Sequence, residues 1–490
     1  MENIILNPEF TDLQNPDTFK NHINQLLNIE IVEHDKLLNE LLNQFETIDF
    51  ITLANPTGRD DFKISNKHYT VLAIENILKI ATSNRWGLCK KLNIIYLYNG
   101  TYWNEVNIES FKQFLSKAAE KMGVPVFSAK YYKFGNELYE QFLSAAYLET
   151  KQANVNKVLI NLNNGTFEIN NGKTKLRPFN RADFLTYKLP FDCNKVSKAP
   201  MFETYLNKVL PNVDCQKVLA EYLGYLFIKN GNNKIKEEKA LILYGSGANG
   251  KSVFFEIVSA LLGTENTCNY SLQNLTDEKG YHRIKLVDKL VNYASEINGK
   301  LESATFKQLV SGEPVEARNP YGQPIIIKQY AKLIFNCNEL PKDIEQTNAY
   351  FRRFLIIPFN VTIPKEQQDK HLHTKIIENE LSGVFNWVLE GLNRLLEQGK
   401  FTDCEEATKA LDEYRSQSDS VKMFLDENEY KPTPVKAYQL IKELYIQYNT
   451  FCVIDGYRPV NKTNFIKRLQ NYNIVVKRIN IGNVAYISNN

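Results

Sequence analysis

The chain has 490 residues, of which 43% are hydrophobic and 23% charged, and its net charge is +3. This composition is ordinary for a soluble globular protein, the length predicts two to four domains, and the net charge says almost nothing about binding partners. The seven cysteines are scattered and form no C-x-x-C pair, so we predict a reduced, cytoplasmic protein without structural zinc. The N-terminus lacks a signal-peptide pattern and no apolar stretch approaches ~18 residues, which excludes a membrane span.

The first 200 residues predict helices followed by two β-hairpins. Apolar residues recur at helical spacing within residues 1–80, and this region carries no motif that reveals a role. Around residues 93–104 and 157–168, β-branched and aromatic runs flank the dipeptides Asn99-Gly100 and Asn164-Gly165, which are typical hairpin turns. From about 200 to 230, the pattern predicts two short amphipathic helices separated by Pro211.

A phosphate-binding motif follows a buried-strand pattern in the string LILYGSGANGKS, residues 241–252. The spacing Gly-x-x-x-x-Gly-Lys-Ser fits a P-loop, and the apolar run after it predicts the helix that such a loop opens. Glycines let backbone N–H groups surround phosphate oxygens, and the helix N-terminus adds positive potential. We expect Lys251 to reach the β- and γ-phosphates of ATP and the Ser252 hydroxyl to bind Mg²⁺. The expected nucleotide-binding residues are Gly245, Ser246, Gly247, Ala248, Asn249, Gly250, Lys251, Ser252 and Val253.

Two strand patterns after the P-loop end on polar residues that could act in hydrolysis. The pattern at 289–297 ends near Glu296, where an NTPase places its water-activating carboxylate. Ser295 precedes it in place of the Asp of the common Asp-Glu pair, so Mg²⁺ would depend more on Ser252, phosphate and water. The apolar pattern at 331–341 ends on Asn338.

A hairpin pattern and a pair of arginines lie beside these strands. Residues 306–328 predict two β-patterned arms around a turn at 319–322. Arg352 and Arg353 stand immediately before an apolar strand pattern that ends near residue 359. An amphipathic helix pattern follows at 370–400 and ends at a glycine.

From about residue 421 the chain changes character. The string PVKAYQLIKELYIQYNTFC predicts a helix with Pro434 near its start, NKTNFIKRLQNY a second helix, and VVKRINIGNVAYIS a hairpin that turns at Gly482-Asn483. Two helices followed by a two-stranded wing are typical of a winged-helix domain, and residues 431–490 carry nine Lys and Arg against two Asp and Glu, a net +7. The expected contacts to duplex origin DNA are Lys462, Asn464, Lys467, Arg468, Lys477 and Arg478.

The order of these elements resembles a superfamily 3 helicase of the AAA+ class, and more narrowly the poxvirus-type and phage/plasmid-type primase-helicase family. The matching strings are INLNNGTFEI, FNRADFLTYKLPFD, FETYLNKVL, YLGYLF, LYGSGANGKS, ASEI, FKQLVSGEPVEARNPYG, LIFNCNELP and RRFLIIPF. They extend from about residue 157 to 360, with weaker similarity on both sides. The resemblance implies an α/β fold with an AAA+ P-loop ATPase core. The domains expected are a mostly helical region at 1–80, an α+β linker domain at 81–200, the core at 201–420 and a winged-helix domain at 421–490.

The resemblance also implies roles for single residues. Lys251 and Ser252 form the Walker A pair, Glu296 is the motif-B carboxylate and a metal ligand, and Asn338 is the sensor that orients the attacking water. One of Arg352 and Arg353 is the arginine finger for the ATP of a neighbouring subunit, and the sequence leaves open which one. A finger in trans makes hydrolysis depend on the subunit interface, so the resemblance implies a homo-oligomeric ring, a hexamer, with ATP and Mg²⁺ as cofactors.

The hairpin is the expected contact to single-stranded DNA in the central channel of the ring. Arg318, Tyr321 and Lys328 would supply charge for phosphates and a ring for stacking. Lys307 is a weaker candidate for a contact to the interface nucleotide.

The sequence before residue 150 contains no strand-borne Asp-x-Asp of the kind that holds two metal ions in a primase. We therefore expect an ATP-dependent ring helicase without a primase, resembling the replication-initiator (Rep) helicases of phage-related mobile elements such as staphylococcal pathogenicity islands. Two alternatives remain open. One is a primase-helicase with an unrecognised primase domain, and the other is a DNA-binding ATPase switch that does not unwind DNA.

Overall fold

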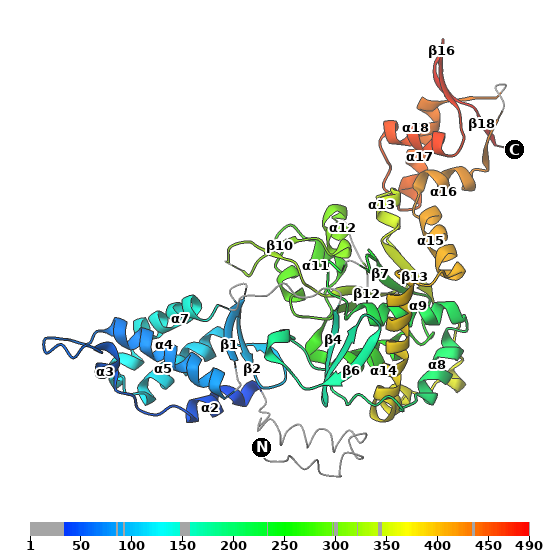
Figure 1. Cartoon of the computed structure of the whole chain (residues 1–490). Helices are drawn as coiled ribbons and strands as arrows, with labels where there is room; N and C mark the ends of the chain where they lie inside the picture. Colours follow the sequence, from blue (N-terminus) through cyan, green and yellow to red (C-terminus); the bar gives the residue numbers. More distant parts are fainter. Residues whose placement is uncertain are drawn as a thin grey trace.

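The computed structural model describes residues 34–84, 87–91, 94–147, 157–232, 234–295, 297, 302–320, 322–341, 345–433 and 437–489. Along the chain they form an N-terminal module, a central α/β core and a C-terminal module that stands beyond the end of helix α15 (Figure 1). Among the described residues, no helix combines the length and the apolar character that crossing a membrane requires.

The N-terminal module packs helices around one apolar cluster that runs from Leu37 to Ala146. This cluster joins residues on both sides of position 80, where the sequence patterns predicted a boundary. The hairpin predicted near residues 93–104 is present as β2 and β3, and β1 adds a third antiparallel strand. The elements of this module are α2 (His34–Asn43), α3 (Phe50–Ala54), α4 (Asn66–Ser83), β1 (Gly87–Lys91), β2 (Ile94–Tyr98), β3 (Trp103–Glu105), α5 (Ile108–Lys121), α6 (Val126–Lys130) and α7 (Tyr132–Ala145).

A second antiparallel sheet lies against the central core. Its strands are β4 (Lys157–Leu162), β5 (Gly165–Asn170) and β6 (Lys173–Arg177), and β4 and β5 form the second predicted hairpin. Apolar residues of β4 and β5 share one buried cluster with helices of the core. The first of these helices, α8 (Pro200–Val209) and α9 (Val213–Tyr225), are the two amphipathic helices predicted around Pro211.

The centre of the core is a parallel five-stranded sheet in the order β13-β7-β12-β9-β8. Numbered along the chain, this order is 5-1-4-3-2, so the P-loop strand lies between the two strands that come last in the sequence. Helices cover both faces of the sheet, and two separate apolar clusters flank it, as buried parallel strands require. The strands are β7 (Ala240–Tyr244), β8 (Thr267–Cys268), β9 (Val291–Ala294), β12 (Lys332–Cys337) and β13 (Phe354–Pro358).

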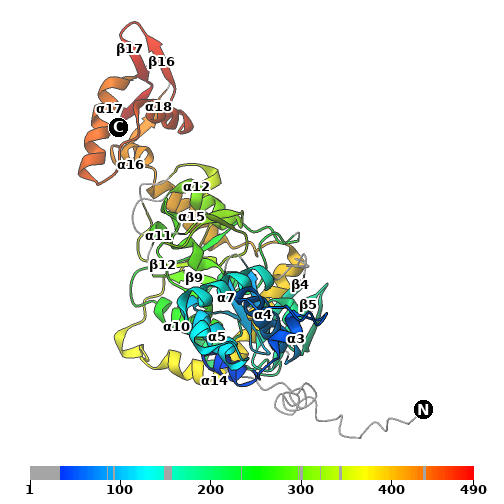
Figure 2. The same ribbon diagram turned by 90° about the vertical axis from the view of Figure 1, so that its left-hand side faces the viewer.

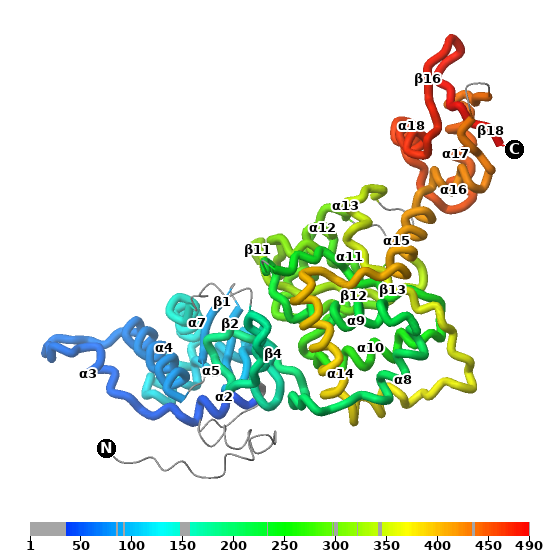
Figure 3. The backbone as a smooth tube through the Cα atoms, turned by 45° about the vertical axis from the view of Figure 1, so that its right-hand side comes forward, coloured from blue at the N-terminus to red at the C-terminus, as the bar shows by residue number. Residues whose placement is uncertain are grey.

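Helices and one hairpin complete the core. The long helix α14 packs on α9 and α10 and is followed by α15, which leads toward the C-terminal module (Figure 3). Residues 306–311 were predicted as part of a hairpin arm, but they belong to helix α12, and the hairpin is confined to the shorter strands β10 and β11. These elements are α10 (Lys251–Leu262), α11 (Leu272–Thr276), α12 (Ser303–Ser311), β10 (Val315–Ala317), β11 (Ile325–Ile327), α13 (Asn348–Phe351), α14 (Leu372–Gln398) and α15 (Glu405–Gln417).

The C-terminal module stands beyond the core at the top of Figure 2. It has its own apolar cluster, which runs from Val421 to Ile487. The helix predicted to start near Pro434 begins only at Ile441, after the short strand β15, and residues 434–436 lie outside the described residues. A hairpin follows the last helix, and β15 pairs with its second strand. The elements are α16 (Ser420–Glu427), β14 (Tyr430–Pro432), β15 (Gln439–Leu440), α17 (Ile441–Ile454), α18 (Lys462–Asn471), β16 (Val476–Ile479), β17 (Gly482–Ala485) and β18 (Ile487–Asn489).

Candidate nucleotide-binding and DNA-contact sites

The loop that carries the Gly-x-x-x-x-Gly-Lys-Ser motif connects β7 to α10 at the carboxyl edge of the central sheet. Residues 240–243 of β7 are fully buried, which fixes the position from which the loop starts. Gly250 has a φ of +88°, and a Cβ at this position would lie 2.7 Å from Cγ1 of Val209. Only glycine can adopt this backbone conformation and also lie so close to Val209, which explains why the second glycine of the motif stands at this position.

The backbone of this loop presents a row of unused hydrogen-bond donors. Within the described chain, none of the N–H groups from Ser246 to Val253 donates a hydrogen bond to another residue. The last of them belong to the first turn of α10, whose N–H groups have no partner inside the helix. Neighbouring free N–H groups at a helix N-terminus form an anion site, because they point at the ligand and the helix dipole favours negative charge.

Lys251 places its ammonium group inside this loop. Its Nζ donates to the carbonyl oxygen of Gly245 at 2.5 Å, to that of Ser246 at 3.4 Å and to Oδ1 of Asn249 at 3.2 Å. Burial lowers the pKa of Lys251 below its usual value. The ammonium group is thus held by neutral oxygens, which a phosphate oxygen can replace with a gain in charge pairing.

Three contacts fix the loop to its surroundings. The Gly245 N–H donates to the carbonyl of Cys337 at 3.1 Å, and Nδ2 of Asn249 donates to the carbonyl of Phe359 at 3.0 Å. The Tyr205 hydroxyl, from α8, donates to the carbonyl of Gly250 at 2.8 Å. The supporting role of Tyr205 was not predicted, and no local pattern marks it, because it comes from a helix 45 residues away.

The polar residues predicted to act on the nucleotide lie at the same edge of the sheet. Cys337 pairs with Tyr244 in register, so Asn338 and Gly245 each stand one residue beyond the sheet, and Asn338 is exposed. Ser252 is exposed in the first turn of α10, beside buried Lys251. Glu296 lies outside the described residues, and the strand that precedes it, β9, ends at Ala294.

The two arginines before β13 have different environments. Arg353 is buried, and its guanidinium donates to the Ser311 hydroxyl at 2.9 Å and to the carbonyl of Ala349, and it lies 3.3 Å from a carboxylate oxygen of Glu238. The Arg352 side chain is 56% exposed, and it pairs with the same Glu238 at 3.0 Å. The Arg353 guanidinium is therefore engaged within the chain, whereas Arg352 has its guanidinium at the surface.

Arg352 lies at the sheet edge opposite the P-loop. β13 runs parallel to β7, and the N–H of Ala240, the first residue of β7, donates to the carbonyl of Arg353. The five residues of β7 separate this level from the P-loop by on the order of 15–20 Å. Arg352 is thus remote from the P-loop of its own subunit.

The residues predicted for the hairpin contact to DNA are only partly described. Arg318 follows β10 at the base of the hairpin, where it donates to the carbonyl of Lys279 at 2.9 Å and lies 5.1 Å from the ring centre of Tyr281. Lys328, one residue after β11, is exposed, and Tyr321 lies outside the described residues. The structure thus gives Arg318 two intramolecular contacts and leaves Lys328 at the surface.

Lys307 is engaged within the subunit. Its ammonium group lies 2.9 Å from a carboxylate oxygen of Glu345, and both side chains are partly buried. Burial opposes ionisation of Glu345, but hydrogen bonds from Ser303, Thr347 and Lys307 outweigh it and lower its pKa to about 2. This ion pair fastens α12 to the segment before α13, so we give Lys307 a structural role.

Five of the six residues predicted to contact duplex DNA are exposed on the C-terminal module. Arg468 is the exception, because its guanidinium pairs with a carboxylate oxygen of Asp419 at 2.9 Å and only 18% of its side chain is exposed. The Tyr472 hydroxyl donates to the same carboxylate at 2.6 Å. Arg468 therefore helps to fasten α18 to the start of α16. The exposed residues are Lys462, Asn464 and Lys467 on α18 and Lys477 and Arg478 on β16.

Two family models match parts of the chain. The model described as "D5 N terminal like" matches residues 67–211, and the model described as "Family of unknown function (DUF5906)" matches residues 243–353. The second match begins in β7 and ends at Arg353, so it contains the P-loop, Asn338 and both arginines. Each match covers less than half of the chain.

A curated viral protein is also similar to the chain. "Putative helicase L207/L206" of Acanthamoeba polyphaga mimivirus is 29% identical over 167 residues, which are 31% of this chain and 17% of the viral protein. Together with the D5-like model, this match supports a primase-helicase family. The match spans about a sixth of the viral protein, so the activity of the whole viral protein does not follow from it.

Solved structures of the NrS-1 C-terminal region in its apo form align with most of the chain. One has a TM-score of 0.45 at 13% identity and covers 84% of this chain and 98% of its own. Another has a TM-score of 0.46 at 14% identity and covers 86% and 99%. A likeness of this extent adds nothing about the chemistry of the site.

Proposed function

We propose that the protein is a superfamily 3 AAA+ ATPase that forms a ring and unwinds DNA to initiate replication of a phage, plasmid or genomic island. The observation that carries this proposal is the P-loop, whose free N–H groups surround the buried Lys251 at one edge of the sheet. The exposed Arg352 lies at the opposite edge of the same sheet. The similarity to a viral protein named a putative helicase supports unwinding of a nucleic acid as the activity, and we propose DNA as the substrate.

ATP binds with its phosphates on the N–H groups of residues 246–253. Lys251 exchanges its loop carbonyl partners for phosphate oxygens, and the tethers to Cys337 and Phe359 keep the loop in place meanwhile. The exposed hydroxyl of Ser252 beside these N–H groups fits Mg²⁺ that is held together with phosphate and water, and Glu296 would complete the site. When bound, Mg²⁺ neutralises charge on the phosphates.

Asn338 is placed to orient the water that attacks the γ-phosphate. It directly follows Cys337, whose carbonyl accepts a hydrogen bond from the N–H of Gly245, and this contact to the first glycine of the P-loop supports the proposed role. Its amide is exposed and can donate to and accept from a water molecule. If other water molecules are kept out of the site, the attacking water stays in the orientation that hydrolysis needs.

Arg352 supplies the arginine finger, and it acts on the ATP of a neighbouring subunit. Its guanidinium is exposed but lies at the sheet edge remote from its own P-loop, so it can reach a phosphate only across a subunit interface. Charge compensation by such a finger is worth ~10³–10⁵ in rate. Hydrolysis that needs two subunits favours a closed ring, for which we propose a hexamer.

DNA contacts the ring at two places in this proposal. The hairpin β10–β11, with Lys328, faces a single strand in the central channel. The C-terminal module binds duplex origin DNA as a winged helix, supported by its order of one helix, two short strands, two helices, a hairpin and a last strand. Exposed basic residues on α18 and β16 would meet DNA phosphates and base edges.

Substitutions at the two halves of the ATP site test the proposal. We expect Lys251→Ala to abolish hydrolysis with the fold intact, measured as phosphate release and by circular dichroism. We expect Arg352→Ala to retain ATP binding but to lower turnover by about 10³-fold, because only the transition state needs the finger. Mixing the two variants should restore part of the activity, since one subunit then offers an intact P-loop and its neighbour an intact finger.

A matched control removes an arginine elsewhere. Arg59 is exposed on the N-terminal module, and Arg59→Ala should leave turnover unchanged. Native mass spectrometry in the presence of ATP and DNA measures the oligomeric state. A protein that stays monomeric under these conditions and still hydrolyses ATP at the full rate would contradict catalysis across an interface. Retained turnover in Lys251→Ala would contradict the nucleotide site itself.

A further inference from the structure

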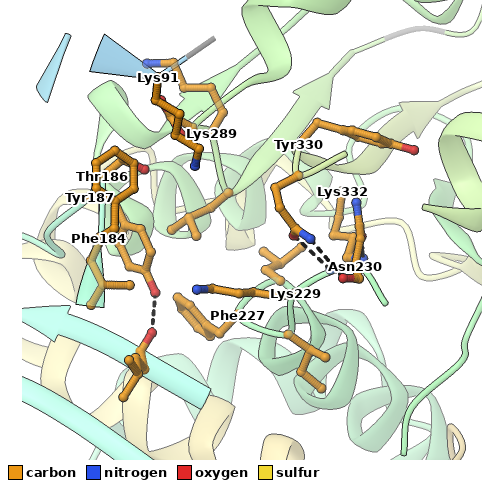
Figure 4. A pocket seen from close by; sticks show the side chains of 17 residues that line it. Lys91, Phe184, Thr186, Tyr187, Phe227, Lys229, Asn230, Lys289, Tyr330 and Lys332 are labelled. Carbon is orange, nitrogen blue, oxygen red and sulfur yellow. Dashed lines mark hydrogen bonds between the residues drawn. The ribbon is translucent and has the colours of Figure 1, made fainter. Parts of the chain in front are cut away.

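A cavity of about 130 Å³ lies where the N-terminal module meets the central core (Figure 4). Its walls come from Lys91 at the end of β1, from Leu159 of β4, and from residues of the segments 184–187, 226–230, 288–290 and 329–332, all but Ala331 of the last. The last two segments lead directly into β9 and β12, so the cavity lies at the amino edge of the sheet. The P-loop is at the opposite edge, and the cavity is therefore separate from the nucleotide site.

Positive charge dominates this cavity. Lys91, Lys229, Lys289 and Lys332 line it, and the single carboxylate among the lining residues is that of Asp288. Burial raises the pKa of Asp288, whose carboxylate accepts a hydrogen bond from the Tyr96 hydroxyl of the N-terminal module. Burial lowers the pKa of Lys332 to about 7. One carboxylate cannot compensate the ammonium groups of Lys91, Lys229 and Lys289, so the cavity has a surplus of positive charge.

Neutral groups hold three of these lysines. The Lys332 ammonium lies 3.3 Å from the Tyr225 hydroxyl and 4.3 Å from the centre of that ring. Lys91 lies 4.5 Å from the ring centre of Phe184, and Lys289 donates to the carbonyl of Glu265. These partners orient the lysine nitrogens and carry no negative charge of their own.

Lys229 differs from these three lysines, because its ammonium group makes no hydrogen bond and no ion pair with the described residues. Burial, followed by the nearby charge of Lys91, lowers its pKa. Figure 4 shows Lys229 and Lys289 approaching the same space from opposite sides. A partly buried cation in this environment is costly, and an anion bound between these lysines removes that cost.

The position of the cavity favours a phosphate of a DNA strand as this anion. β11 of the hairpin ends at Ile327, and the chain continues within two residues into the wall of the cavity at Gln329 and Tyr330. A strand that follows the hairpin thus passes the cavity. Phe184 and Tyr187 in the walls offer aromatic surface beside the lysines, the combination that single-stranded nucleic acids favour.

We propose that this cavity binds a backbone phosphate of single-stranded DNA between Lys229 and Lys289, at the junction of the N-terminal module and the core. The choice of DNA as the source of the phosphate rests on the proposed function, and the presence of an anion site does not. The N-terminal module thereby contributes Lys91 to DNA binding.

DNA affinity of the full chain tests this site. The probe is a fluorescein-labelled oligothymidylate, and its anisotropy is measured over a range of salt concentrations without ATP. We expect Lys229→Ala to weaken binding by about three- to tenfold and to reduce the slope of log K against log salt by about 0.7, the value for one phosphate contact to a single strand. Lys229→Ala/Lys289→Ala should weaken binding further but reduce the slope by about the same 0.7, because both lysines contact one phosphate, and Lys229→Arg, which keeps the charge, should retain the slope.

Lys117→Ala is the matched control, because Lys117 is an exposed lysine on α5 of the N-terminal module. Equal affinity and salt slope for Lys229→Ala and Lys117→Ala would overturn the proposal. A different outcome is that inorganic phosphate stabilises the wild-type protein against heat and fails to stabilise Lys229→Ala, while both proteins bind DNA equally well. That result would assign the cavity to free phosphate and overturn DNA as the ligand. The DNA-binding measurement uses no ATP. If the wild-type protein had no ATPase activity, the proposed function would be refuted, but the effect of Lys229→Ala on DNA affinity would still stand.

Discussion

Arg352 and Arg353 are adjacent in the sequence but differ in what surrounds their guanidinium groups. Arg353 is buried against Ser311, Ala349 and Glu238, so Arg353→Ala leaves a partly buried carboxylate and a hydroxyl with fewer partners. We expect this variant to lose about 2 kcal/mol of unfolding free energy, measured by urea denaturation. Arg352→Ala should change it by less than about 0.5 kcal/mol, because exposed ion pairs contribute little. Equal losses in the two variants would contradict the division of roles.

This pair illustrates what the sequence can and cannot reveal at the scale of residues. The strand, loop and helix around residues 240–262 were predictable, because a short local spacing determines their backbone. The different exposure of Arg352 and Arg353 was not, because Arg353 is buried against Ser311, 42 residues earlier in the chain. The sequence predicted a DNA contact for Arg468, because it could not reveal the ion pair with Asp419, which lies 49 residues away.

Helices α9 and α14 approach each other closely at the centre of the core. A Cβ at Gly224 would lie 2.6 Å from Cβ of Leu392 and 2.8 Å from its Cα, closer than packed atoms can be. We expect Gly224→Ala to lower the unfolding free energy by about 1–3 kcal/mol, because the two helices must move apart. The midpoint of chemical denaturation measures the loss.

Gly135 on α7 provides the comparison, since its nearest neighbour is the rotatable hydroxyl of Ser116 at 3.1 Å. Gly135→Ala should be neutral or slightly stabilising, because alanine favours a helix by up to about 1 kcal/mol. A Gly224→Ala protein as stable as Gly135→Ala would show that the α9–α14 contact is looser than the structure has it.

Elements were predictable where one periodicity extended over the whole segment. The paired hairpins around 93–104 and 157–168 and the long helix α14 follow from such patterns. The string 306–311 was predicted as a strand because its apolar residues precede a β-patterned run, yet it packs as the end of α12 through Phe306 and Leu309. Packing against the sheet makes this segment helical, and a local sequence pattern gives no information about that packing.

At the scale of the whole molecule, the apolar clusters divide the chain differently from the sequence patterns. One cluster holds residues 37–146 together, and the cavity of four lysines exists only because this unit meets the core. Each of those lysines comes from a different segment, so no local pattern indicated the site. Clusters of charge that assemble from distant segments are visible only after the fold is known.

The C-terminal module should be separable from the core. Its apolar cluster contains only residues 421–487, and it joins the core through α15 and through hydrogen bonds from Gln346 to Ser418. A chain that ends after Ser418 should therefore fold and hydrolyse ATP within about twofold of the full chain. Its affinity for duplex DNA should fall, and its salt slope should flatten by about 0.9 for every phosphate that the shortened chain no longer reaches.

The double variant Lys477→Ala/Arg478→Ala separates DNA binding from folding in this module, because both side chains are exposed on β16. It should reproduce part of the decrease in duplex affinity with an unchanged thermal midpoint. Arg468→Ala should behave in the opposite way, since breaking its pair with Asp419 loosens α18 from α16 and lowers the midpoint. Electrophoretic mobility shifts and differential scanning calorimetry on the same samples measure the two effects. Duplex affinity that survives both the truncation and the double variant would move the duplex-binding surface to another part of the chain.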